Sequence, residues 1–104
     1  MSSSRSERSQ PVAVLSFAAT DPTGGAGIQA DLLTLSSMGC YALSVVTAIT
    51  VQDTAGVEGV YPIDSDWVVD QARLLLEDIP VAAFKIGMVG SVENVAAIAE
   101  VISD

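Results

Sequence analysis

The chain has 104 residues and a formal net charge of −9, and half of its residues are hydrophobic, which suits one small domain with a buried core and excludes a disordered segment. Only four residues are basic, and two of them, Arg5 and Arg8, lie in the first ten residues, so the chain lacks the basic face that binds nucleic acid or an anionic membrane. It has no histidine, which excludes a Ser-His-Asp or Cys-His catalytic site and a zinc site built on imidazole. Its single cysteine, Cys40, excludes a disulfide within the chain and a zinc site built on a cysteine cluster.

The first ten residues, MSSSRSERSQ, are polar and rich in serine. They contain no apolar stretch, so we expect residues 1–10 to form a disordered tail and not a secretory signal, with the folded portion over residues 11–104. No apolar run in the chain reaches the roughly 18–20 residues that a membrane-spanning helix needs. These features predict a cytoplasmic protein.

The first two predicted strands are separated by one helix. The apolar run from Val12 to Ala18, which includes Ser16, predicts a buried strand. A helix is predicted from Gly27 to a stop at Gly39. Four apolar residues recur on one face of this helix: Ile28, Leu32, Leu35 and Met38. The run from Ser44 to Val51 is rich in β-branched residues and predicts the second strand.

Two more strands and two more helices are predicted after this point. Residues 56–62 predict a shorter strand, and Asp64 or Ser65 can cap a helix that Pro80 ends. The buried side of that helix is predicted to carry Val68, Ala72, Leu75 and Ile79. Residues 81–87 predict a short strand, and Ser91 can cap the last helix. Its predicted buried stripe consists of Val95, Ile98, Ala99 and Ile102.

The predicted order is β-α-β-β-α-β-α, with apolar strands and amphipathic helices. This order is typical of a largely parallel sheet with helices packed on it. Four strands make a thin sheet, and an open edge of a parallel sheet normally has a covering neighbour. The pattern therefore indicates either the first part of a larger α/β domain or a small domain that is completed by association.

A glycine-rich stretch, TDPTGGAGIQAD, joins the first predicted strand to the first helix. Residues 25–30 formally satisfy the dinucleotide fingerprint G-x-G-x-x-G/A, and Asp53 follows the second strand near the expected distance. Against this interpretation, residues 20–23 lengthen the turn, and Asp21 places a negative charge where a pyrophosphate would bind. The alternative is a tight turn in which Asp21 or Thr23 caps the helix while Gln29 and Asp31 are solvated.

Residues at two other strand ends are candidates for a ligand site. Gln52 ends the second strand, and ligands of open α/β sheets bind at the carboxyl ends of strands. Its amide offers a donor and an acceptor, which matches an aminopyrimidine edge, whereas a solvated strand end is the alternative. Gly87 and Met88 mark a second such end, where methionine can pack on a flat ring.

Lys85 and Cys40 are expected to be structural. Lys85 is the only lysine, and we expect it to form an ion pair with one of the many acids, a substrate phosphate being the alternative. Cys40 follows the predicted helix stop, so we expect a small turn or core residue and not a nucleophile.

Three stretches, TDPTGGAGIQADL, GCYALSVVTAITVQDTAGV and KIGMVGS, resemble in order and spacing the N-terminal part of the hydroxymethylpyrimidine/phosphomethylpyrimidine kinases. These are thiamine-biosynthesis enzymes of the ribokinase-like superfamily, and the resemblance covers the whole chain after the tail. It implies an incomplete three-layer α/β/α sandwich with a mostly parallel sheet. It also implies a kinase that uses ATP and Mg²⁺ to phosphorylate 4-amino-5-hydroxymethyl-2-methylpyrimidine and then its monophosphate.

The same resemblance implies a set of substrate-binding residues: Ala26, Gly27, Asp31, Gln52 and Met88. The glycine loop and Asp31 would lie against the substrate, Gln52 would read the amino and ring-nitrogen edge of the pyrimidine, and Met88 would pack near the ring. Residues 53–61 resemble a flap that helps to close the site and contributes to a homodimer.

The ATP-binding loops of the family, its N-x-x-E metal region and its late G-T-G-C motif have no counterpart in this sequence. We therefore expect no catalytic residue and no metal site in this chain, and we expect it to be inactive without the C-terminal portion of the kinase. Two other interpretations stay open. One is a non-catalytic pyrimidine-binding or dimerisation module, and the other is part of a pyridoxine or pyridoxal kinase.

Overall fold

The structure is a computed structural model that describes residues 11–104, so the tail predicted over residues 1–10 lies outside the described part. Its elements are β1 (Ala13–Ala19), α2 (Gly27–Ser37), β2 (Tyr41–Gln52), β3 (Val57–Pro62), α3 (Ser65–Asp78), β4 (Ala83–Ile86) and α4 (Val92–Ser103). The predicted order of strands and helices is confirmed, and β2 begins earlier in the chain than predicted.

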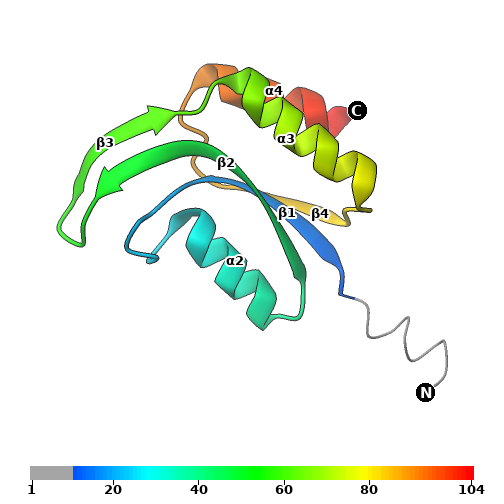
Figure 1. Cartoon of the computed structure of the whole chain (residues 1–104), viewed down its shortest axis with the longest axis horizontal. Coiled ribbons are helices and arrows are strands. Elements are labelled where there is room, and N and C mark those ends of the chain that lie inside the picture. The colour runs from blue at the N-terminus through cyan, green and yellow to red at the C-terminus, as the bar shows by residue number, and fades with distance from the viewer. Residues whose placement is uncertain (1–10) are drawn as a thin grey trace.

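The four strands form one sheet in the order β3-β2-β1-β4. β1 is parallel to both β2 and β4, whereas β3 returns antiparallel to β2. Figure 1 shows α2 against one face of the twisted sheet and α3 beside α4 on the other, while the β2–β3 hairpin extends beyond the helices. The three layers and the mostly parallel sheet confirm the predicted fold class.

The hydrophobic core lies between the sheet and the layer of α3 and α4. Its members on the two central strands are Ala13, Leu15, Phe17, Leu43 and Val45, and those on the helices are Val68, Ala72, Ile98 and Val101. Full burial of side chains of this size contributes about 1.5–3 kcal/mol each. Because side chains alternate along a strand, the opposite face of β1 presents smaller buried groups, Ser16 and Ala18, on the side of α2.

The end of α2 and the starts of α3 and α4 follow the signals predicted from the sequence. After α2, Gly39 has a φ of +82°, and the amide of Cys40 donates to the carbonyl of Leu35, which is a Schellman ending. Asp64 caps α3 and Ser91 caps α4, each through a side-chain oxygen that accepts a backbone N–H. Within residues 11–104, no helix has the length and apolar character needed to cross a membrane.

Several apolar residues of the predicted strands and helix faces are exposed. Val12 in the first predicted buried strand is exposed, as are Ile49 and Val51 in the second. Met38 is 71% exposed because it lies beyond the last residue of α2, where the chain turns away at Gly39. Val95 and Ala99 are also exposed, since the buried face of α4 carries Asn94, Ile98 and Val101. α4 is apolar around most of its surface, so its spacing alone could not identify which stripe faces the core.

Candidate functional site

A pocket of about 300 Å³ lies where β1, β2 and β4 end. Its lining residues are Ala18, Ala19, Thr20, Asp21, Ala26, Gly27, Asp31, Thr50, Gln52, Val57, Val60, Lys85, Gly87 and Met88. This is the position in which open α/β sheets bind ligands. The set includes all five residues that were predicted to bind substrate, so the fold gathers them from three separate stretches of the chain.

The loop between β1 and α2 is organised by the carboxylate of Asp21. Its Oδ1 accepts hydrogen bonds from the backbone and the side chain of Thr23, and its Oδ2 accepts one from the amide of Ala26, each at 2.9 Å. These bonds, the backbone one first, hold the pKa of Asp21 below its usual value of 3.8, although desolvation acts in the opposite direction. The helix cap by Asp21 or Thr23, which belonged to the tight-turn alternative, is wrong, because Ala26 is the N-cap residue.

The two ends of this loop approach each other at Gly27. A Cβ atom on Gly27 would lie 2.6 Å from the carbonyl oxygen of Ala19, and the residue has a φ of +70°. Both the contact and the left-handed conformation exclude other residues. The first turn of α2 therefore lies directly over the end of β1, which brings Asp31 to the pocket.

These contacts decide against the dinucleotide interpretation of the glycine-rich stretch. In a dinucleotide site, backbone amides at the start of the helix bind the pyrophosphate. Here the Ala26 amide is taken by Asp21, and Oδ1 of Asp53 accepts hydrogen bonds from Ala55 and Gly56 in its own turn. Gln29 is not solvated as expected, since its Oε1 accepts the amide of Asp21 at 2.8 Å.

One end of the pocket carries an ion pair. Nζ of Lys85 lies 2.7 Å from Oδ1 of Asp31, as the structural interpretation of Lys85 predicted. Oδ2 of Asp31 accepts a hydrogen bond from the hydroxyl of Ser16 at 2.8 Å. The Asp31 side chain is only 11% exposed, which corrects the expectation that it is solvated. Both of its oxygens are held in place by the chain.

The amide of Gln52 is a second polar group of the pocket. Its Nε2 donates to the hydroxyl of Thr50 at 2.7 Å, and that hydroxyl donates to the carbonyl of Thr20 at 2.7 Å. Because the Thr50 proton is already used, the group facing its lone pair must be the donor end of the Gln52 amide. The amide orientation is thereby fixed, and Oε1 and the second N–H of Gln52 stay available to a ligand.

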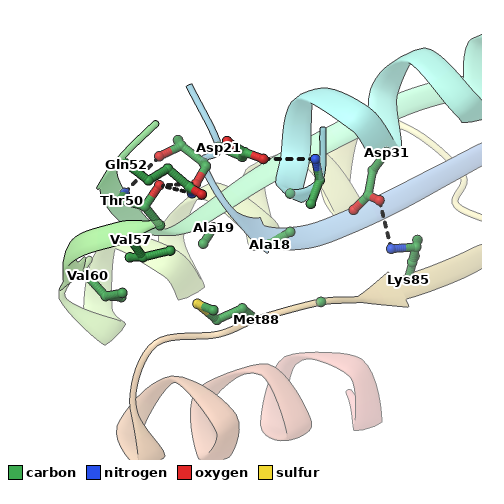
Figure 2. A pocket seen from close by; sticks show the side chains of 14 residues that line it. Ala18, Ala19, Asp21, Asp31, Thr50, Gln52, Val57, Val60, Lys85 and Met88 are labelled. Carbon is green, nitrogen blue, oxygen red and sulfur yellow. Dashed lines mark hydrogen bonds and ion pairs between the residues drawn. The ribbon is translucent and has the colours of Figure 1, made fainter. Parts of the chain in front are cut away.

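Apolar side chains form the remaining walls. Figure 2 shows Val57 and Val60 near Thr50 and Gln52, with the Asp31–Lys85 pair at the opposite end of the pocket and Met88 between the two ends. Ala18 and Ala19 form the floor at the end of β1. Met88 is 56% exposed, so its side chain has space to pack on a ligand. Such an arrangement suits a flat, mostly apolar ring with one polar edge.

Sequence reasoning missed Ser16 and Thr50, which orient Asp31 and Gln52. A signal existed for each residue. Ser16 is a lone hydroxyl inside an apolar strand, and Thr50 lies two residues before Gln52, on the same face of the strand. Val57 and Val60 fall within the flap segment that was predicted over residues 53–61.

The described residues do not fit a nucleotide with its metal ion. In residues 11–104 there is no group of three or more His, Cys, Asp or Glu residues that could hold a metal. The two cations of this range, Arg73 and Lys85, are both in ion pairs with carboxylates.

A family model and individual relatives point to the same protein family. The family model described as phosphomethylpyrimidine kinase matches residues 21–104. The hydroxymethylpyrimidine/phosphomethylpyrimidine kinase of Salmonella typhimurium is 46% identical over 91 residues, which are 88% of this chain and 34% of the relative. The chain thus spans about a third of the length of the curated relatives that it matches.

Solved structures show the same likeness. The phosphomethylpyrimidine kinase of Clostridium difficile is 46% identical with a TM-score of 0.84, over 88% of this chain and 40% of that one. The pyridoxal kinase of Bacillus subtilis, solved as an ADP complex, is 33% identical with a TM-score of 0.83, over 90% of this chain and 37% of that one. The fold is therefore shared by kinases named for two different substrates, phosphomethylpyrimidine and pyridoxal.

The role of Asp21 predicts a pH-dependent stability. A lowered pKa in the folded state stabilises the fold above the usual value of 3.8, and this contribution disappears as the pH falls from there through the folded pKa. We expect Asp21→Asn to be less stable than the wild type near pH 7 and the difference to shrink below about pH 4. Urea unfolding of both proteins at several pH values measures this difference in the free energy of unfolding. Asp70→Asn, on the exposed side of α3, is the control, and a difference for Asp21→Asn that is constant down to pH 2.5 would contradict the assignment.

Proposed function

The chain belongs to the phosphomethylpyrimidine kinase family, and we propose that it forms the pyrimidine-binding part of a kinase that phosphorylates 4-amino-5-hydroxymethyl-2-methylpyrimidine and its monophosphate with ATP. The observation that carries the proposal is the fixed amide of Gln52 at the edge of a pocket of about 300 Å³. The family membership supports the class of substrate, and the shape and polar groups of the pocket support each proposed contact.

Gln52 is suited to an aminopyrimidine because of its orientation. An aminopyrimidine presents an exocyclic N–H donor next to a ring-nitrogen acceptor. The free Oε1 of Gln52 would accept from the amino group, and its second N–H would donate to the ring nitrogen. Since Thr50 and Thr20 hold the amide in this orientation, little rotational freedom is lost when the ligand binds.

The other proposed contacts follow from the shape of the pocket. Met88 would pack on the face of the ring, and sulfur makes favourable contacts with aromatic groups. Ala26, Gly27 and Asp31 would lie against the substrate on the side of α2. Asp31 would approach the hydroxymethyl group as an acceptor, with its position fixed by Ser16 and Lys85.

The exposed edge of β4 offers a docking surface for the remaining part of the proposed kinase. β4 pairs only with β1 among the described strands, and all four of its residues are exposed. Ile86, Val89, Val95, Ile98 and Ala99 line an apolar groove between β4 and α4. A further parallel strand along β4 would cover this groove. That part would bind ATP and Mg²⁺, and ATP supplies the phosphoryl group.

We propose that the complete protein is a cytoplasmic homodimer. The β2–β3 hairpin, which includes the proposed flap, exposes apolar side chains: Ile49, Val51, Val57 and Tyr61. Exposed apolar residues concentrated on a projecting hairpin are typical of an interaction surface. A second copy of the chain would cover them and would support the hairpin wall of the pocket.

A pyridoxal kinase is the second candidate, because the Bacillus subtilis enzyme shares the fold at a TM-score of 0.83. Pyridoxine has no amino group next to its ring nitrogen, so it cannot present the adjacent donor and acceptor that Oε1 and the second N–H of Gln52 would bind. Orientation of the Gln52 amide favours the pyrimidine.

Replacement of Gln52 tests the pyrimidine site. Gln52→Ala is expected to weaken binding of hydroxymethylpyrimidine roughly tenfold, because two hydrogen bonds to the ring edge are lost. The measurement is the thermal shift of the 104-residue chain against ligand concentration. Gln71→Ala on the exposed side of α3 is the matched control. Equal shifts in the Gln52→Ala variant and the wild type would remove Gln52 from the site, and a larger shift with pyridoxine than with the pyrimidine would favour the second candidate.

Addition of the missing part tests the kinase proposal. The 104-residue chain alone is expected to leave ATP unchanged in the presence of hydroxymethylpyrimidine. Mixed with the part of the Salmonella typhimurium relative that lies outside the match, it is expected to form ADP. The substitution Ile86→Asp, in the apolar groove beside β4, should abolish this activity, whereas Leu74→Asp on the exposed face of α3 should leave it unchanged.

Two results would contradict this account. ADP formation by the isolated chain would show that these residues need no further part. Equal activity of the Ile86→Asp and Leu74→Asp mixtures would show that the groove beside β4 is not the docking surface.

A further inference from the structure

A β-bulge places Thr47 beside the segment that carries Met88. Ala18 pairs with Val46, but Ala19 pairs with Ala48, which leaves Thr47 as an extra residue on β2. Bulges re-aim side chains and occur frequently next to functional sites. The hydroxyl of the buried Thr47 donates to the carbonyl of Met88 at 2.7 Å. Thr47 itself does not line the pocket.

The amide of Asn94 holds three segments together behind this contact. Its side chain is fully buried, and Nδ2 lies 3.1, 3.0 and 3.0 Å from the carbonyl oxygens of Thr47, Ile63 and Val89. The two protons of Nδ2 are shared among these three acceptors. These carbonyls belong to β2, to the connection before α3 and to the segment after β4. If the amide were reversed, its oxygen would face three carbonyl oxygens, so the donor end must point toward them.

The Asn94 amide is used almost entirely for these three bonds. Its Oδ1 is buried and accepts no hydrogen bond within residues 11–104. Burial of an unpaired amide oxygen is unfavourable. A leucine of similar volume would avoid that cost but could not join the three carbonyls.

The segment from Gly87 to Gly90 also lies close against the interior at both of its ends. The amide of Gly87 donates to the carbonyl of Phe17 at 2.8 Å. Gly90 has a φ of +83°, and a Cβ atom there would lie 3.0 Å from the Cβ of Ala48. Thr47 and Asn94 hold the two residues between these ends, Met88 and Val89.

The opposite wall of the pocket has no comparable support. Val57 and Val60 lie on β3, which pairs only with β2 and is exposed along most of its length. The pocket therefore has one wall that is fixed by the interior of the protein and one that is carried by a projecting hairpin. A ring that binds between them would be placed by the fixed wall.

We propose that Thr47 and Asn94 are positioning residues that hold the Met88 wall at the distance required by a single flat ring. The proposal rests on the proposed function, since it assigns a role in that same pocket. Neither residue touches the ligand, and both act through the segment of residues 87–90.

The test uses Thr47→Val, which keeps the shape of the side chain and removes the hydroxyl. Amide hydrogen exchange of the 104-residue chain is expected to become faster in residues 86–94 and to stay unchanged in residues 28–37 of α2. Affinity for hydroxymethylpyrimidine, measured by calorimetry, should fall about fivefold, because ligand binding must then supply the ordering that one net hydrogen bond supplied before. Thr47→Ser, which keeps the hydroxyl, should have the slow exchange in residues 86–94 and the affinity of the wild type. Thr34→Val on the exposed side of α2 is the matched control.

A double variant separates positioning from general stability. In a Met88→Ala background, Thr47→Val is expected to cause no further loss of affinity, because the wall that it positions is already removed. An equal loss in both backgrounds, unchanged exchange in residues 86–94, or a Thr47→Ser variant as weak as Thr47→Val would each overturn the proposal. If the wild-type chain binds no pyrimidine, the proposed function fails, whereas the exchange data still decide whether Thr47 holds the segment.

Discussion

The close approach of α2 to the end of β1 is the constraint on which the rest of the site depends. It requires Gly27, whose Cβ position would lie 2.6 Å from the carbonyl of Ala19, and it is maintained by the three hydrogen bonds that Asp21 accepts within the loop. Because a carboxylate of the chain occupies the amide of Ala26, the loop does not need a bound phosphate to keep its shape. In the proposed kinase, the glycine-rich stretch would lie on the acceptor side and form one side of the pocket.

The polar groups of that pocket are oriented by residues behind them. Ser16 and Lys85 hold the two oxygens of Asp31, and Thr50 sets the direction of the Gln52 amide. On the Met88 side, Thr47 and Asn94 hold the backbone. Preorganisation of this kind lowers the entropy lost on binding. The exposed hairpin and the open edge of β4 contrast with this interior, and both are suited to further protein surface.

Much of the fold could be predicted from local signals. The β-branched run of β2 and the stops at Gly39 and Pro80 have direct physical causes in backbone preference. The five site residues could be named because they stand at strand ends or in the glycine loop, and because their motifs resemble those of a known family. The exposure of Val95 and Ala99 could not be predicted, because α4 is apolar on nearly every side and packing alone selects its buried face. The Thr47 bulge was also not predictable, since it arises from the pairing of two strands and leaves no mark in the sequence of either.

The central claim is that the pocket at the ends of β1, β2 and β4 binds the pyrimidine edge through Gln52. An NMR titration of the ¹⁵N-labelled chain with hydroxymethylpyrimidine tests it directly, because the side-chain amide signals of Gln52 and Gln71 can be followed in one experiment. The account predicts saturable shifts of the Gln52 side-chain amide and of the backbone amides of Gly27 and Met88, with Gln71 unchanged. The absence of saturable shifts at Gln52, or shifts confined to the α3–α4 face, would contradict it.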